Sequence, residues 1–98
     1  MPSGSLKRLQ AVEITVATLN RARRDVEAKL PRGPYEAPDQ KCSGLVLRVR
    51  PRSITWIFRA RLGGKFKTWT IAGIDNLSAP SKARDRANET RTLGSGLN

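Results

Sequence analysis

The sequence contains no histidine and only one cysteine, Cys42. Without histidine, Ser-His-Asp and Cys-His catalysis and histidine-ligated metal sites are excluded. A single cysteine cannot form an internal disulfide, and we interpret Cys42 as a small, half-buried spacer rather than a reactive thiol. The eight carboxylates are scattered among basic residues, with no close pair that would mark an acid–base site. We therefore expect no catalytic activity, no metal and no cofactor.

Long apolar runs are absent as well. No segment is long enough to span a bilayer, and charges at Lys7, Arg8 and Glu13 interrupt the region where a signal peptide would have its apolar core. We expect an intracellular, cytoplasmic protein without membrane association. The 98 residues leave room for one small domain with a limited core.

Acidic residues are scarce, with eight Asp and Glu against 19 Lys and Arg, which gives a net charge of +11. Residues 1–40 carry seven basic and five acidic groups, and residues 75–98 carry four and three. Residues 41–74 carry eight basic groups and no acidic group. This balance predicts a polyanionic partner, nucleic acid first and an acidic membrane surface second, bound by the middle of the chain.

The N-terminal part of the chain predicts one helix between two irregular segments. Residues 1–13 show no sustained apolar period and are predicted to be a disordered tail. A helix is predicted over residues 15–30, with Thr15 as its N-cap, and residues 31–44, rich in proline, are predicted to be an extended connector in which Tyr35 packs against the core. Four apolar residues lie on one face of this helix: Leu19, Ala22, Val26 and Leu30.

Three strands are predicted over residues 44–51, 54–62 and 65–73, because apolar and basic residues alternate there. Two-residue turns are expected at Arg52-Ser53 and at Gly63-Gly64. In this register the predicted cross-strand pairs are Leu45–Ala60, Leu47–Phe58, Val49–Trp56, Phe58–Trp69 and Trp56–Ile71.

A last helix is predicted over residues 78–93, capped by Ser78. Its inward stripe consists of Leu77, Ala83, Ala87 and either Thr90 or Leu93. The predicted fold is therefore α+β, with a three-stranded antiparallel sheet packed on a C-terminal helix and a further short N-terminal helix.

The predicted register gives the sheet one apolar face and one basic face. Trp56 and Trp69 have the parity of the apolar face, which favours core packing over base stacking. The basic face has no carboxylate, so its field is unopposed and matches a phosphate backbone. Its predicted members are Val46, Arg48, Arg50, Thr55, Ile57, Arg59, Arg61, Phe66, Thr68 and Thr70.

The segment GLVLRVRPRSITWIFRARLGGKFKTWTIAG, followed by IDNLSAPSKARDRANE, resembles a known family. It combines GL-x-L-x-V, W-x-F-R-x-R, a basic glycine hairpin and an A-R-x-x-A helix. Together these are similar to the N-terminal arm-type DNA-binding domain of phage and genomic-island tyrosine recombinases (integrases), over residues 14–98. The chain departs from the family pattern in a longer link over 39–44, in a first hairpin that is one residue shorter, and in the replacement of the usual helix-opening apolar residue near Pro80.

The resemblance implies that the open sheet face lies in the major groove of arm-type DNA sites. It also implies that this chain is part of a longer bacterial, nucleoid-associated recombinase, whose other domains supply the catalytic residues and contact other protomers. The isolated domain is expected to be monomeric.

The predicted DNA contacts fall into three groups. Arg48, Arg59 and Arg61 are expected to contact base edges or phosphates. Flanking phosphate contacts are assigned to Arg50, Arg52, Lys65 and Lys67, and secondary polar contacts to Thr68 and Thr70. The Arg59→Ala substitution is expected to leave the thermal midpoint almost unchanged.

Two alternative functions would use the same face of the sheet: a free-standing sheet-based transcription regulator and an RNA-binding module. A protein-interaction module is less favoured, because the sheet edges carry Lys and Arg.

Overall fold

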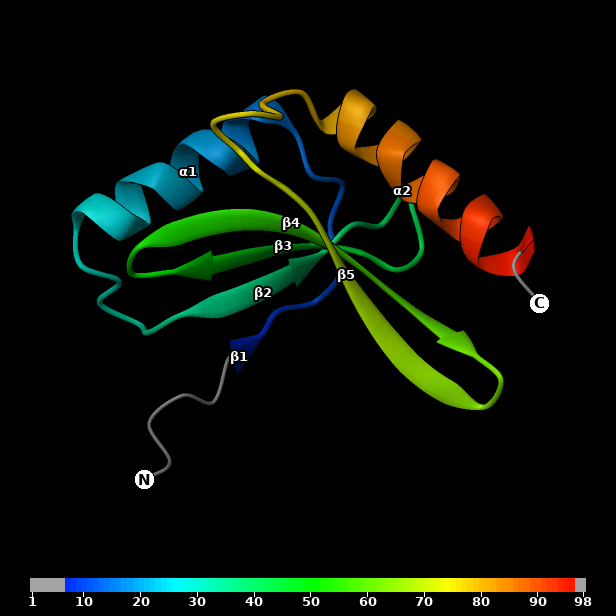
Figure 1. Cartoon of the computed structure of the whole chain (residues 1–98). Helices are drawn as coiled ribbons and strands as arrows, with labels where there is room; N and C mark the ends of the chain where they lie inside the picture. Colours follow the sequence, from blue (N-terminus) through cyan, green and yellow to red (C-terminus); the bar gives the residue numbers. More distant parts are fainter. Residues whose placement is uncertain (1–6, 97–98) are drawn as a thin grey trace.

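Five strands form one mixed sheet in the order β1-β2-β3-β4-β5 in the computed structural model, which describes residues 7–96 (Figure 1). β1 pairs parallel to β2, and the other neighbours are antiparallel. The strands are β1 (Lys7–Arg8), β2 (Tyr35–Pro38), β3 (Leu45–Arg50), β4 (Ser53–Leu62) and β5 (Lys65–Gly73).

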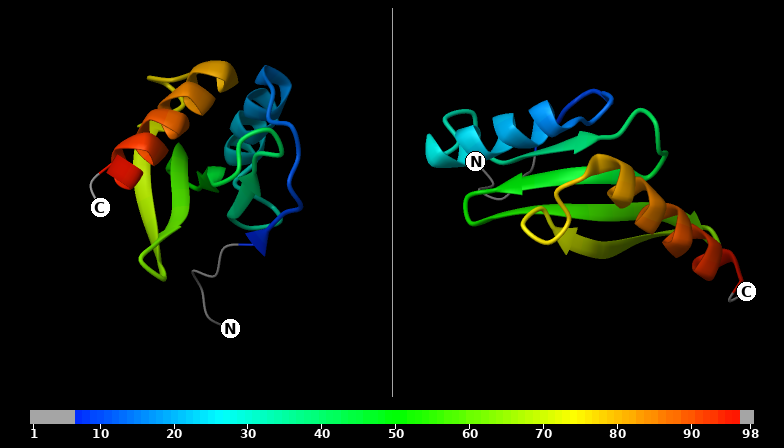
Figure 2. Two further views of the ribbon diagram at one scale, coloured as in Figure 1. Left: turned by 90° about the vertical axis from the view of Figure 1, so that its right-hand side faces the viewer. Right: turned by 90° about the horizontal axis from the view of Figure 1, so that it is seen from above.

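Two helices, α1 (Val16–Glu27) and α2 (Pro80–Gly96), complete an α+β fold. Both helices cover the same face of the sheet, and no helix lies on the other face within the described residues (Figures 1 and 2). We call the uncovered side the open face. Over residues 7–96, neither helix is both long and apolar enough to cross a membrane.

The two additional strands correct the predicted three-stranded sheet. β2 lies within the predicted connector, where Pro38 ends the strand and so disturbs few ladder hydrogen bonds. Residues 7–12 lie along β2 instead of forming a tail: the Leu9 amide donates to the Glu36 carbonyl at 2.9 Å, and the Val12 amide donates to the Pro38 carbonyl at 3.0 Å. These are backbone bonds, which need no apolar periodicity in the sequence. The rest of the predicted tail, residues 1–6, lies outside the described residues.

The first hairpin confirms the predicted faces but not the predicted partners. Leu45 pairs with Phe58 and Leu47 with Trp56, so the register differs by two residues from the predicted one. The turn is Pro51-Arg52 rather than Arg52-Ser53, because proline favours the first central position of a turn and cannot donate to the ladder. A shift of two residues leaves every side chain on the same face.

The second hairpin turns at Gly63-Gly64 and pairs Phe58 with Trp69, as predicted. The predicted pair of Trp56 with Ile71 is wrong. An irregularity between Trp56 and Ile57 leaves Trp56 opposite Ala72, so β5 contains one extra residue at this point.

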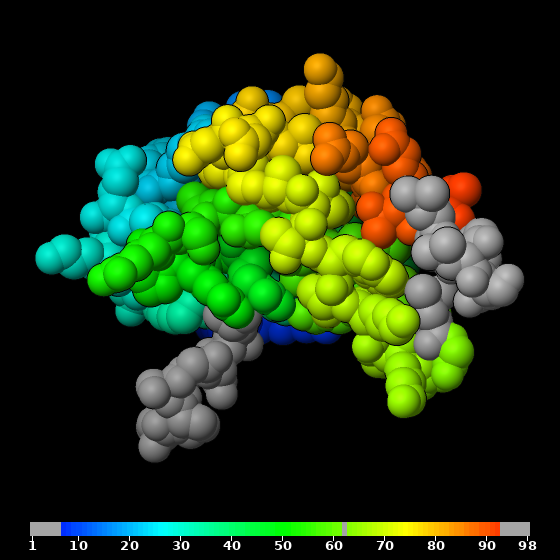
Figure 3. Space-filling view, in the orientation of Figure 1, coloured from blue at the N-terminus to red at the C-terminus, as the bar shows by residue number. Residues whose placement is uncertain are grey.

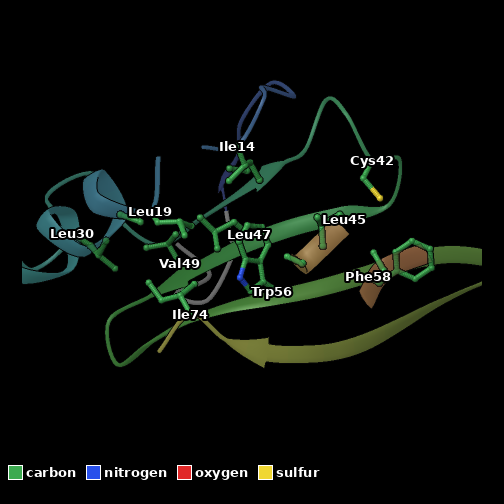
Figure 4. Packing of buried hydrophobic residues seen from close by; sticks show 14 residues of the cluster. Ile14, Leu19, Leu30, Cys42, Leu45, Leu47, Val49, Trp56, Phe58 and Ile74 are labelled. Atoms are coloured by element: carbon green, nitrogen blue, oxygen red, sulfur yellow. The ribbon is translucent and has the colours of Figure 1, made fainter. Parts of the chain in front are cut away.

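The core lies between the apolar face of the sheet and the two helices (Figure 4). Trp56 and Phe58 are its largest fully buried side chains, and the Trp56 indole Nε1 donates to the Leu77 carbonyl at 2.8 Å. Ala83 and Ala87 of α2 are completely buried, which confirms that small residues face the sheet. The inward parity predicted for Trp56 is therefore confirmed.

The helix ends differ from the predicted bounds by a few residues. Thr15 is the N-cap of α1, as predicted, and forms a reciprocal capping box with Thr18. The helix ends three residues early, at Glu27, because Lys29 and Leu30 adopt left-handed φ angles of 63° and 48°. α2 begins at Pro80, which is tolerated in a first turn, and extends beyond the predicted residue 93.

A buried carboxylate joins the N-terminal segment to α2. Asp39 follows β2, and its side chain is fully buried. Arg84 donates through Nε to Oδ2 at 2.7 Å and through Nη2 to Oδ1 at 3.1 Å, while the Ile14 amide donates to Oδ1 at 3.1 Å. Burial alone would raise the pKa of Asp39, but the hydrogen bonds from Arg84 and Ile14 outweigh it and hold this pKa below its ordinary value.

Gly44 provides a test of backbone packing beside β4. Its φ is +92°, and a Cβ there would lie 2.6 Å from the Arg59 carbonyl oxygen and 2.7 Å from the Phe58 ring. Gly33 has a similar φ of +85° but open space around it. We expect Gly44→Ala to lower the free energy of unfolding by about 2–5 kcal/mol, and Gly33→Ala by only about 1–2 kcal/mol. Urea denaturation measures both, and equal losses would contradict the close contact.

Replacing Asp39 tests the buried ion pair. We expect Asp39→Asn to cost about 2–4 kcal/mol at pH 7, because Arg84 is left without its anionic partner. The pKa of Asp39 is lower in the folded protein than in the unfolded chain, where it is about 4. Ionised Asp39 therefore stabilises the fold above about pH 4, and this stabilisation is lost as the pH falls through the pKa of the folded state. The variant should therefore lose less stability than the parent protein on acidification below about pH 4.

Asp75→Asn is the matched control, because the Asp75 side chain is 97% exposed and lies 3.9 Å from Arg23. Its unfolding curve should follow that of the parent protein at every pH. An Asp39→Asn curve that also follows the parent would show that the buried pair does not support the fold.

Candidate nucleic-acid interface

A row of polar side chains crosses the open face of the sheet. Arg8, Glu36, Arg48 and Thr55 are successive partners on β1, β2, β3 and β4, so their side chains leave the sheet on one side. This side is opposite the core face, to which Val49 belongs. The open face is therefore the part of the sheet surface available to a partner.

Glu36 lies at the centre of this row and binds two arginines. Arg48 donates to Oε2 through Nε at 3.0 Å, and its Nη2 lies 2.9 Å from the same oxygen. Arg59 donates through Nη1 to Oε1 at 3.3 Å and through Nη2 to Oε2 at 3.2 Å. The Glu36 side chain is 7% exposed. We call Glu36, Arg48 and Arg59 the Glu36 cluster.

The ion pair between Arg59 and Glu36 spans the middle of the open face. Arg59 is on β4 and Glu36 is on β2, so the pair passes over β3. Between them lie Val46 and its partner Ile57, which are 2% and 1% exposed although they face away from the core. The open face of the sheet therefore has two buried apolar residues beside the ion pair that neutralises Glu36.

Glu36 stays ionised at neutral pH within this cluster. Burial alone would raise the pKa of Glu36, but hydrogen bonds from Arg59 and Arg48 outweigh burial and lower this pKa. Two guanidinium groups and one carboxylate leave the cluster a net charge of +1. The expectation that no carboxylate lies on the open face is therefore wrong, because Glu36 lies in the segment that was predicted to be a connector.

The other predicted cations are exposed at the two ends of the sheet. Arg50 and Arg52 lie at the β3–β4 turn, and Arg61, Lys65 and Lys67 lie near the β4–β5 turn. These two turns are at opposite ends of the sheet (Figure 1). Basic ends thus flank the Glu36 cluster.

The faces of the β4–β5 hairpin separate the predicted contacts further. Thr68 and Thr70 are exposed and pair with Arg59 and Ile57, which places both threonines on the open face. Lys65 and Lys67 have the opposite parity, because Lys67 pairs with Ala60 of the core side. The structure therefore does not bring these two lysines onto the open face, although both are exposed.

The tip of this hairpin extends away from the helices (Figure 3). Phe66 is 66% exposed there and pairs with Arg61, whose Cζ lies 4.7 Å from the Phe66 ring centroid. A large exposed aromatic beside a cation is typical of a contact surface. Phe66 was placed on this face by the predicted register but was not included among the candidate contacts.

Glu36 is the residue of the candidate site that the sequence did not predict. The sequence pattern that indicates a strand here is only four residues long. In Tyr35-Glu36-Ala37-Pro38, residues that face the helices alternate with residues that face the open side. Tyr35 packs against the core, as predicted, and its hydroxyl donates to Asp25 at 2.7 Å. Recognising this alternation would have placed Glu36 opposite Arg48.

Cys42 and the acidic side chains are candidates for reactive or metal-binding groups. Cys42 is 5% exposed, and burial raises the pKa of its thiol, so the thiolate needed for reactivity is disfavoured. Over residues 7–96 there is no group of three or more Cys, Asp or Glu side chains that could hold a metal ion.

Comparison with known proteins gives one match. A model of the family described as the arm DNA-binding domain matches residues 9–96, which is most of the chain. No curated protein and no solved structure matches the chain.

The Glu36 cluster changes the expected effect of the Arg59→Ala substitution. We expect it to lower the free energy of unfolding by about 1–3 kcal/mol, because the largely buried Glu36 loses charged hydrogen bonds. Arg61→Ala is the control, because Arg61 is exposed and should change stability by less than about 0.5 kcal/mol. Thermal denaturation compares the two, and an unchanged midpoint for Arg59→Ala would show that the cluster does not hold in solution.

Proposed function

The chain belongs to the arm DNA-binding domain family, and on that basis we propose that it binds double-stranded DNA at arm-type sites for a site-specific tyrosine recombinase. In this proposal the open face of the sheet lies in the major groove. B-DNA has a major groove about 12 Å wide, which admits β-strands. The observation that carries the proposal is the placement of exposed cations at both ends of a face that no helix covers.

The interface we propose has a centre and two flanks. Arg50 and Arg52 hold phosphates at one end, and Arg61, Lys65 and Lys67 hold phosphates at the other. The lysines reach the backbone from the hairpin edge, because long side chains can extend past their own strand. Arg48 faces the base edges at the centre, with Arg59 beside it, and Thr68 and Thr70 add polar contacts.

A binder of RNA or single-stranded DNA is the alternative from another class. Such proteins stack bases on several aromatic side chains. Trp56 is completely buried, and Trp69 packs against the core, so Phe66 is the large aromatic left exposed among the described residues. Competition between duplex and single-stranded DNA of one sequence separates these functions, and we expect the duplex to compete more strongly.

The recombinase role carries further expectations. The catalytic Arg, His and Tyr residues and the contacts between protomers would belong to other domains of the parent integrase, and the isolated domain would be monomeric. A chromosomal partner places the protein in the bacterial cytoplasm. A free-standing sheet-based regulator remains the alternative, and the coding sequence after Asn98 distinguishes them: we expect codons for a recombinase catalytic domain there.

Salt dependence tests the phosphate contacts. With about five phosphates neutralised, the logarithm of the binding constant should fall against the logarithm of salt concentration with a slope of about −4 to −5. Arg52→Ala should make this slope shallower by about 1, because one phosphate contact is removed. Fluorescence anisotropy on a labelled duplex measures both slopes.

Lys82→Ala is the control for that measurement. Lys82 is exposed on α2, which lies on the other side of the sheet, so the slope should not change. A salt response that is flat for the parent protein, or that changes equally in both variants, would rule out the proposed flanks.

A further inference from the structure

Glu36 is an acidic residue at the centre of a surface that otherwise suits a polyanion. A buried carboxylate at this point weakens the attraction to phosphate, and it is held by both central arginines rather than exposed to water. We propose that Glu36 is a positioning residue that orients Arg48 to read a guanine base. This inference rests on the proposed binding of duplex DNA.

The contacts of Arg48 with Glu36 use one edge of its guanidinium, and the Arg48 side chain remains 22% exposed. A guanidinium has two edges that can form paired hydrogen bonds, one with Nε and Nη2 and one with Nη1 and Nη2. Arg48 presents its Nε and Nη2 to Glu36. The Nη1 and Nη2 edge keeps both of its parallel N–H groups, and within residues 7–96 this edge has no hydrogen-bond partner. Two donors of this kind match O6 and N7 of guanine in the major groove.

Arg59 binds the same carboxylate as Arg48, but through the other edge of its guanidinium. It presents its Nη1 and Nη2 edge to Glu36, and its Nε donates to Thr68 Oγ1 at 3.5 Å. Neither edge is left complete for a base. Arg59 therefore holds Glu36 in place, while Arg48 is the residue that reads the base.

The fixed geometry has an energetic consequence for recognition. A free arginine loses rotamer freedom when it binds a base, whereas Arg48 is already held by Glu36 before DNA arrives. The carboxylate also lowers the attraction to phosphate of any sequence. Removing the charge of Glu36 should therefore lower the affinity for the preferred DNA site. The affinity for duplex DNA of random sequence should stay equal or increase.

The first experiment locates the base that Arg48 reads. The complete 98-residue chain is used to select preferred sites from a random duplex pool, and we expect a guanine to be required at a position within them. Replacing that guanine by 7-deazaguanine removes the N7 acceptor and keeps base pairing. The parent protein should lose about fivefold or more in affinity on this replacement, and Arg48→Lys, which keeps the charge but has no rigid pair of parallel donors, should lose clearly less than the parent.

The second experiment tests the role of Glu36. The specificity ratio is the affinity for the selected duplex divided by that for the random pool. Glu36→Gln should lower this ratio about tenfold or more, with affinity for the pool unchanged or increased. Combining Glu36→Gln with Arg48→Lys should lower the ratio no further than Arg48→Lys alone, because Glu36 acts through Arg48.

Two α2 variants are matched controls, because their residues are exposed and lie away from the open face: Glu89→Gln for the loss of a carboxylate and Arg86→Lys for the conservative change. Both should leave the ratio unchanged. If Glu36→Gln does not fold, the comparison of Arg48→Lys with 7-deazaguanine still decides whether Arg48 is the reader.

Different results overturn the two proposals. An unchanged ratio in Glu36→Gln, or effects that multiply in the double variant, would show that Glu36 does not position Arg48. Selected sites without a required guanine, or an equal 7-deazaguanine effect in Arg48→Lys, would exclude the guanine contact while leaving duplex binding intact. Failure of the parent protein to bind any duplex with a salt-dependent affinity would overturn the proposed function itself.

Discussion

A buried carboxylate has to be neutralised by a cation, and this requirement acts on both sides of β2. On the helix side, Asp39 holds Arg84 and the Ile14 amide, which fixes α2 and the start of α1 against the sheet. On the open side, Glu36 holds Arg48 and Arg59. β2 and the residue that directly follows it therefore support both the packing of the helices and the arrangement of the centre of the candidate interface.

The sequence predicted the elements that depend on local patterns. Thr15 could be recognised as a cap, Gly63-Gly64 as a turn and Trp56 as a core residue, because each follows from turn chemistry or from alternation with period two. Alternation fixes the face but cannot distinguish registers that differ by two residues, and the turn at Pro51 set the one observed.

The sequence could predict only those residues of the candidate site whose environment does not depend on contacts with distant parts of the chain. The exposed Arg50 and Arg52 follow from strand and turn positions alone. Arg48 and Arg59 could not be interpreted correctly without β2, because their partner lies 12 and 23 residues earlier in the chain. Part of the excess charge of residues 41–74 is therefore used inside the fold, and the cations at the two turns remain for a partner.

The β4–β5 hairpin has a consequence for how recognition can evolve. Its tip, with Arg61 and Phe66, is exposed and lies outside the core, so substitutions there change the surface without changing the packing. Arg48 and Arg59 lack this freedom, since a change in either alters the environment of a buried carboxylate. Under the proposed function, the contacts of the hairpin tip with DNA can therefore change one residue at a time, whereas a change at the centre requires coordinated substitutions in β2, β3 and β4.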